Sequence, residues 1–324
     1  MSRQLLFSAS AIAVMGVASV AGPARAQVVV PDASIEGLIQ SVDATPGSGL
    51  LGGVPVNWVG EMQVMGVKIR VLDDAPLHSP TASVTIADIA GVGNPLPGRT
   101  QDGFVGGTAI VTGDSSGSVI YATDVFVEAA ENVILGEATV PANGNVTVND
   151  VEAVRLLDPR MPAGLPINGF GFEINTASIA AQSPLSLEGY FAGGKLYYHT
   201  LEADGGTLAR PTTPEVSVLR AQCRVRGGNR DELEVRGGTH TPAGTAVTIE
   251  ISDSTVTTAP HPGQWRVLTP TAAPIVDNTV TPAQGLYRFN RTNLNLPGSV
   301  CPAFVRASIL NHTVHSDPLA PDSR

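Results

Sequence analysis

Two segments of the sequence align with each other without a gap, and this internal repeat is the feature that most restricts the fold. The segments are GDSSGSVIYATDVFVE (residues 113–128) and GYFAGGKLYYHTLEAD (residues 189–204), at an offset of 76 residues. Each has the pattern of an incoming strand, a tight turn and an outgoing strand with alternating apolar side chains. The repeat predicts two copies of one structural unit, over residues 30–128 and 132–205.

Two weaker similarities lie upstream of the aligned segments. SIEGLI (34–39) is echoed by VILGEA (133–138), and LGGVPV (51–56) by VNDVEAV (148–154). Each copy then contains about five strands with small-residue turns, and a unit of this size that leaves no open edge is a small barrel. We therefore expect an all-β protein with two tandem OB-like barrels, residues 27–130 and 131–206.

The pattern GLIQSVDA…GGVPV…GGTAIVTGDSSGSVIYATDVFVE resembles small β-barrel domains of unknown function in secreted bacterial proteins. The resemblance covers both copies, about half of the chain, and rests on glycines and on alternation. It implies a barrel fold and supplies no catalytic residues.

A different pattern follows the second copy. Glycines and prolines interrupt any regular element at 205–214, which predicts a linker over residues 207–215. Residues 216–312 then contain seven short strand candidates, as expected of an immunoglobulin-like or fibronectin-like β-sandwich. Residues 313–324 are expected to form a polar tail.

Residues 1–26 have the layout of a cleavable secretory signal. Arg3 precedes an apolar run, and the small-x-small triplet Ala24-Arg25-Ala26 precedes Gln27. A retained membrane anchor is the alternative, but no later stretch approaches the 18 apolar residues of a spanning helix. The mature chain is expected in the periplasm or outside the cell, without a transmembrane segment.

The charge is divided unevenly along the chain. Residues 27–215 hold 7 basic and 21 acidic residues, a net charge of −14, whereas residues 216–324 hold 10 basic and 8 acidic residues. An acidic surface repels phosphate backbones, which argues against nucleic acid as a partner. The partner we expect is an envelope or surface protein, or a glycan.

The stretch AQCRVRGGNRDELEVRGGT (221–239) predicts a β-hairpin, because apolar and charged residues alternate on both sides of GGNRD. A five-residue loop would place Arg226 opposite Glu232 and Arg224 opposite Glu234. A nucleic-acid-binding RGG segment would instead be repetitive and strongly basic.

The two cysteines, Cys223 and Cys301, lie 78 residues apart, each on the apolar face of its strand candidate. In an oxidising compartment two buried, facing cysteines should be joined, so we predict a disulfide, with Trp265 packed beside it. Two buried free thiols are the alternative.

Candidate catalytic and metal motifs are weak in this sequence. GDSSG (113–117) fits the serine-nucleophile pattern GxSxG, but it is expected at a hairpin tip instead of a strand-to-helix turn. On a strand, His312 and His315 would face opposite sides and could not share a metal ion, whereas on a flexible tail they could bind one weakly. We predict no catalytic, metal-binding or cofactor-binding residues and no cofactor.

The most polar cluster lies in SLEGYFAGGKLYYHTLEA (186–203). A Gly193-Gly194 turn would pair Tyr190 with Tyr197 and Glu188 with His199 on the outer face of a hairpin. This face is the candidate ligand surface, and an ordinary amphipathic outer face is the alternative.

These patterns favour a non-enzymatic binding or structural protein. A hydrolase whose carboxylates converge only in three dimensions remains an alternative, as does a cation-binding envelope protein.

We predict cleavage of the signal after Ala26. Amino-terminal sequencing of the exported protein should therefore begin at Gln27. Recovery of intact residues 1–26 in a membrane fraction would contradict this expectation.

Overall fold

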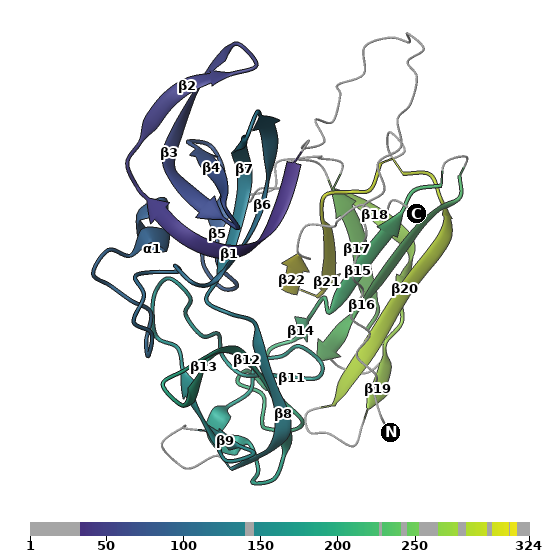
Figure 1. The fold of residues 1–324 in the computed structure, drawn as a ribbon. Coiled ribbons are helices and arrows are strands. Elements are labelled where there is room, and N and C mark those ends of the chain that lie inside the picture. Colours follow the sequence, from purple (N-terminus) through teal and green to yellow (C-terminus); the bar gives the residue numbers. More distant parts are fainter. Residues whose placement is uncertain are drawn as a thin grey trace.

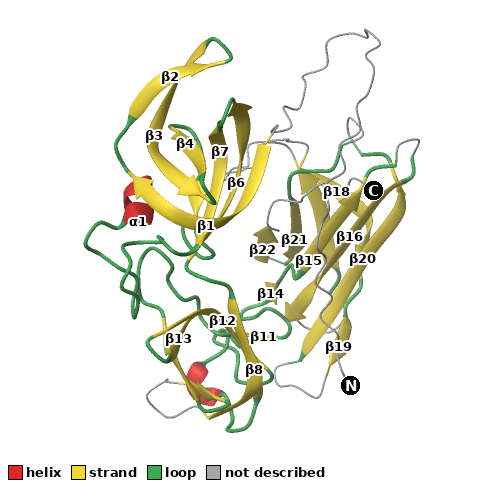
Figure 2. Cartoon of the chain, viewed as in Figure 1, coloured by secondary structure: helices red, strands yellow, loops and turns green. Residues whose placement is uncertain are grey.

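The computed structural model describes residues 33–139, 146–226, 229–240, 245–252, 265–277, 283–296, 300–310 and 312–315. These residues form two barrels and a pair of open sheets, which Figure 1 shows as three neighbouring bodies. Among these residues, helix is confined to two short segments in the barrels (Figure 2). The predicted all-β class is confirmed, and the predicted signal segment, residues 1–26, lies outside the described residues.

The first barrel is built from the first seven strands. Their bounds are β1 Ala33–Asp43, β2 Gly47–Leu51, β3 Val54–Val64, β4 Val67–Leu72, β5 Leu77–His78, β6 Thr108–Ser116 and β7 Val119–Glu128. Five of them close a ring, because β1 pairs with β3, β3 with β4, β4 with β7, β7 with β6, and β6 with β1. Only the β4–β7 pairing in this ring is parallel. The other two strands extend it: β2 pairs with β3, and β5 with β7.

The second barrel repeats this arrangement. Its strands are β8 Asn132–Thr139, β9 Val146–Val148, β10 Val151–Arg155, β11 Ile167–Asn168, β12 Pro184–Ala192 and β13 Lys195–Ala203. The ring runs β8–β9–β10–β13–β12 and returns to β8, with a parallel β10–β13 pairing. The prediction of two small closed barrels is confirmed.

The hairpins β6–β7 and β12–β13 match residue by residue at the offset of 76. Gly113 lies opposite Ala122 and Gly189 opposite Tyr198, in each case directly after a register shift in the ladder. A Cβ on Gly113 would stand 2.1 Å from the carbonyl oxygen of Tyr121, and one on Gly189 2.0 Å from that of Tyr197. Each bulge therefore requires a glycine, which explains why the repeat preserves these two positions.

The weaker upstream alignment of 51–56 with 148–154 is wrong. Residues 148–154 contain the tight β9–β10 turn at Asn149-Asp150, whose counterpart is the Met65-Gly66 turn between β3 and β4. All four turn residues have positive φ, as two-residue hairpin turns require. Residues 51–56 contain the turn between β2 and β3, with its Gly-Gly pair. The described part of the second barrel has no strand equivalent to β2, so this turn has no counterpart there.

Each barrel carries one short helix in the connection before its fourth ring strand, and neither was expected from the sequence. These are α1 Ile86–Ala90 and the 3₁₀ turn η1 Thr176–Ser178. Thr85 caps α1, and its hydroxyl and backbone amide exchange hydrogen bonds with Asp88. A helix of five residues is too short for an apolar period to be recognised.

The C-terminal module contains two open sheets. Its strands are β14 Glu215–Val216, β15 Arg220–Arg224, β16 Asp231–His240, β17 Val247–Ser252, β18 Trp265–Ala272, β19 Ile275–Asp277, β20 Gln284–Leu294, β21 Val305–Ile309 and β22 His312–His315. One sheet has the order β14–β16–β20–β19, with β15 also on β16, and the other β18–β17–β21–β22. Apolar side chains of both sheets form one core. The last strand, β22, extends into the segment expected to be a polar tail.

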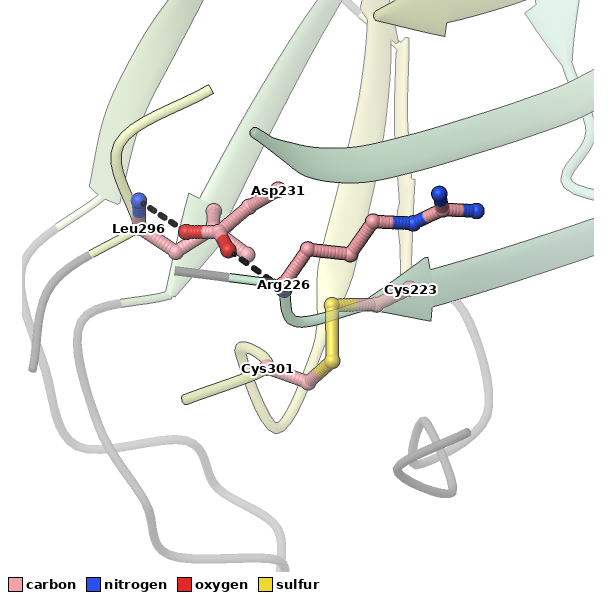
Figure 3. The surroundings of a disulfide bond; sticks show 5 residues. All are labelled: Cys223, Arg226, Asp231, Leu296 and Cys301. Carbon is pink, nitrogen blue, oxygen red and sulfur yellow. Dashed lines mark hydrogen bonds between the residues drawn. A yellow bond between two sulfur atoms is a disulfide. The ribbon is translucent and has the colours of Figure 1, made fainter. Parts of the chain in front are cut away.

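The β15–β16 hairpin has the predicted faces but not the predicted register. Glu232 lies opposite Arg224 and Glu234 opposite Gln222, a shift of two residues that leaves the apolar parity intact. The loop is longer than expected because Asp231 organises it: the carboxylate accepts hydrogen bonds from the backbone N–H of Arg226 and of Leu296, at 2.9 and 3.1 Å (Figure 3). Local charge pairing could not reveal this long-range partner.

The predicted Cys223–Cys301 disulfide is confirmed, with a Cα–Cα distance of 5.8 Å. Cys223 lies on β15 of one sheet, and Cys301 precedes β21 of the other, so the bond ties the two sheets together (Figure 3). Trp265 was expected beside the bond. Its ring packs against the guanidinium of Arg306, 4.4 Å away; the two residues lie on β18 and β21, on either side of β17 in the second sheet.

Replacing both Cys223 and Cys301 by serine should lower the free energy of unfolding of the C-terminal module by about 4 kcal/mol, because the loop that the bond closes gains freedom in the unfolded chain. Urea denaturation of the oxidised wild type, the reduced wild type and the double variant measures this. The reduced wild type should match the variant, and equal midpoints for all three proteins would contradict the expectation.

Candidate functional site

The hairpin expected to carry a ligand surface has most of the predicted pairing. Tyr190 lies opposite Tyr197, as predicted, and Gly193-Gly194 forms the turn. Glu188 lies opposite Thr200 instead of His199, because the bulge between Glu188 and Gly189 shifts the register by one residue.

The expected exposure of this face is wrong for Tyr190 and His199, which are only 1% and 5% exposed. The Tyr190 ring packs with the core of the first barrel and stacks on Tyr197, with ring centroids 5.4 Å apart. The Tyr190 hydroxyl donates to the Pro97 carbonyl at 2.8 Å. Alternation identifies two faces of a strand but not a neighbouring module that buries the outer one.

Arg160 provides the central polar contact between the barrels. Its guanidinium donates to the carbonyls of Asn94 and Pro95, at 2.7 and 3.3 Å, and forms a 2.6 Å ion pair with Asp158. The Arg160 side chain is 5% exposed, and its hydrogen bonds hold the pKa of Asp158 below its usual value despite burial. Leu156 and Met161 of the second copy also belong to the core of the first barrel, whereas the interior of the second barrel forms a core of its own.

A second polar joint attaches the C-terminal module to the second barrel. The Ser217 hydroxyl donates to the Phe170 carbonyl at 2.6 Å and accepts from the Gly238 amide at 2.8 Å. Asn168 donates through its side-chain amide to that of Gln284 at 2.7 Å, and both residues are buried. These contacts fix the orientation of the module through directional bonds.

The segment expected to be a linker, residues 207–215, also takes part in this joint. Leu208 is buried in the core of the second barrel, and the Ala209 amide donates to the Glu173 carbonyl at 2.9 Å. Glu215 pairs with Arg210 at 2.7 Å and already belongs to β14. Glycine and proline here produce an irregular segment that packs against the barrel.

Glu131 and Glu188 lie within electrostatic range of Glu128, where β7 leads into the second barrel, and the three are named here the junction carboxylates. Burial raises the pKa of Glu128, and repulsion from Glu131, Glu188 and Glu36 raises it further. Burial also raises the pKa of Glu188, with a smaller contribution from Glu131. Strand alternation placed Glu188 on the candidate ligand surface but did not reveal its acidic neighbours, of which Glu128 lies on β7 and Glu131 in the connection to β8.

The outer face of the first barrel carries an aromatic and cationic cluster. The guanidinium carbon of Arg70 lies 4.1 Å from the ring centroid of Trp58, and its Nη1 donates to the Tyr121 hydroxyl at 2.8 Å. Glu61 accepts from Arg70 Nε at 2.9 Å. Trp58 is 8% exposed because β2 lies over it, where a Cβ on Gly47 would approach the ring to 2.5 Å. The rings are therefore packed and do not form an open stacking platform.

The remaining candidate motifs, GDSSG and the histidine pair, lie in a hairpin and on the last strand. GDSSG (113–117) spans the end of β6 and the start of its hairpin turn, as predicted. His312 Nδ1 accepts a hydrogen bond from the Val216 amide at 3.1 Å, whereas the side chain of His315 lies outside the described part. Within the described ranges, no group of three or more His, Cys, Asp or Glu residues is arranged to hold a metal ion.

Among the described residues, no helix has the length and apolar character needed to cross a membrane. Comparison with protein-family models, with curated proteins and with solved structures finds no match for the chain.

Substitution of Glu188 by glutamine should raise the free energy of unfolding at pH 7. The folded-state pKa of Glu188 is raised, so its protonated form favours folding below the unfolded-state pKa, and this contribution is lost as the pH rises through the folded-state value. The gain from Glu188→Gln should therefore shrink between pH 7 and pH 4 in urea denaturation. Glu137→Gln, at an exposed position on β8, is the matched control. A gain that is the same at both pH values would contradict the burial and repulsion described here.

Proposed function

We propose that the chain is an exported, non-enzymatic binding or structural protein, with two OB-like barrels and an immunoglobulin-like β-sandwich. The ring order supports the first assignment, because strands numbered within each barrel follow 1-2-3-5-4 and close on strand 1. A five-stranded Greek-key barrel with this connectivity is the OB architecture, which commonly binds oligonucleotides and oligosaccharides. Two sheets around one core, tied by a disulfide, support the second assignment.

The observation that carries the proposal is that buried polar side chains join the modules to one another. Arg160, Tyr190 and Ser217 each form a hydrogen bond to the backbone of a neighbouring module. These buried polar side chains, which could otherwise take part in catalysis, therefore hold the three modules in one arrangement. A rigid binding scaffold requires such a fixed arrangement. The expected partner is a periplasmic or surface protein, or a glycan, and export is expected from residues 1–26.

The junction carboxylates favour a second candidate, a secreted carboxylate-based hydrolase. A general acid must keep its proton near the working pH, and burial with like-charged neighbours raises the pKa of Glu128 and Glu188 in that direction. Glycosidases use two such carboxyl groups on either side of the bond that they cleave.

Polysaccharide retention and cleavage, measured on the same samples, distinguish the two candidates. The purified mature chain is run in native gels containing alginate, pectin or dextran, and reducing ends are counted after incubation with each polymer. We expect retention by at least one polymer and no release of reducing ends. Release that disappears in Glu188→Gln but persists in Glu137→Gln would replace the binding proposal with the hydrolase.

A further inference from the structure

Three arginines stand in a row across the outer face of the first C-terminal sheet. Arg220 of β15 lies opposite Arg236 of β16, which lies opposite Arg288 of β20, on strands that Figure 1 shows side by side. Neighbouring strands are about 4.8 Å apart, so the three side chains leave the sheet at one-strand intervals. Arg220 is exposed, and the side chains of Arg236 and Arg288 are 44% and 55% exposed.

The row is only partly neutralised. Glu234 pairs with both Arg236 and Arg288, the second at 3.1 Å, whereas no carboxylate among the described residues pairs with Arg220. Like charges placed directly opposite each other on a sheet are destabilising. The row therefore costs folding stability, and ion pairing among the described residues of the module does not explain why Arg220 is present.

The surrounding face is basic, although residues 27–215 are strongly acidic. Arg224 and Arg226 continue the face beyond the row, and both pair with Glu232 at 3.3 Å. Five arginines and two glutamates give this face, named here the arginine face, a net charge of +3.

A shallow groove of about 260 Å³ adjoins the row. Gln222, Asn290 and Thr292 contribute amide and hydroxyl groups to it, beside Arg224, Glu232 and Glu234. The aromatic side chains of β20, Tyr287 and Phe289, are buried in the core on the other face. The groove therefore offers hydrogen bonds to hydroxyl groups and no aromatic surface for stacking a base.

We propose that the arginine face binds a carboxylate-bearing polysaccharide; this names a ligand class for the binding function proposed above and rests on it. A guanidinium recognises a carboxylate through two parallel hydrogen bonds. Carboxylates on successive sugar rings meet successive arginines of the row, and sugar hydroxyls bind the amide groups of the groove. Single-stranded nucleic acid fits less well, because its sequence-tolerant binding relies on exposed aromatic side chains that this face lacks.

The test compares alginate, neutral dextran and oligothymidylate as ligands of the full mature chain, by affinity electrophoresis and calorimetry. Wild type should bind alginate and not dextran, with affinity that falls as salt rises. Arg220→Gln combined with Arg288→Gln should weaken alginate binding at least about tenfold, because two charge-assisted contacts are lost. Arg266→Gln, at an exposed arginine on the opposite sheet, is the matched control and should leave binding unchanged.

Folding and function are separated within the same experiment. Thermal unfolding should show that the single variant Arg220→Gln is at least as stable as wild type, since it removes one of the opposed like charges, so its loss of alginate binding reports on recognition. Alginate binding that is absent in wild type, or unchanged in the double variant, overturns the inference and leaves the binding or structural proposal standing. Tighter binding of oligothymidylate, lost in the double variant, assigns the face to nucleic acid instead. Release of reducing ends from bound alginate refutes the non-enzymatic proposal but not recognition by this face.

Discussion

The buried guanidinium of Arg160 is the interaction on which the arrangement of the barrels depends. A charged group taken out of water is costly unless it is paired and hydrogen-bonded, and Asp158 with the carbonyls of Asn94 and Pro95 meets that need. Those carbonyls belong to the first barrel. The second barrel is therefore held in the position in which the guanidinium of Arg160 forms these hydrogen bonds. Tyr190 reinforces the position by donating to Pro97 in the same loop. The joint at Ser217 then orients the C-terminal module on the second barrel, and the arginine face with it.

The two barrels share one strand order but use equivalent positions differently. Tyr121 and Tyr197 correspond at the offset of 76. In the first barrel Tyr121 packs beside Trp58 and Arg70, under the strand β2 of its own arm. In the second barrel Tyr197 stacks with Tyr190 and contacts Gly98 of the first barrel. The same face of the repeat is thus covered by a strand of its own copy, β2, in the first barrel and by the neighbouring copy in the second barrel.

Patterns local in sequence predicted the parts of the structure that depend on local geometry. Strand parity placed Cys223, Leu233 and Val235 in the core, and the preserved glycines Gly113 and Gly189 marked equivalent hairpins. The errors arose where a distant residue decides the outcome. Asp231 sets the hairpin register through the amide of Leu296, and Tyr190 is buried by a loop 93 residues earlier in the chain. The junction carboxylates and the arginine row were missed for the same reason, since their members come from separate elements.

The core of the first barrel limits how far the two copies of the repeat are independent modules, because residues of the second copy complete it. Leu156, Met161 and Tyr190 belong to the second copy by sequence, yet they complete the core of the first barrel. A fragment that ends between the copies would leave an apolar surface of the first barrel open to water, which favours aggregation over independent folding. The unit that is repeated along the chain is therefore smaller than the unit that folds, and neither copy could be exchanged, deleted or multiplied alone without rebuilding the contact with the other.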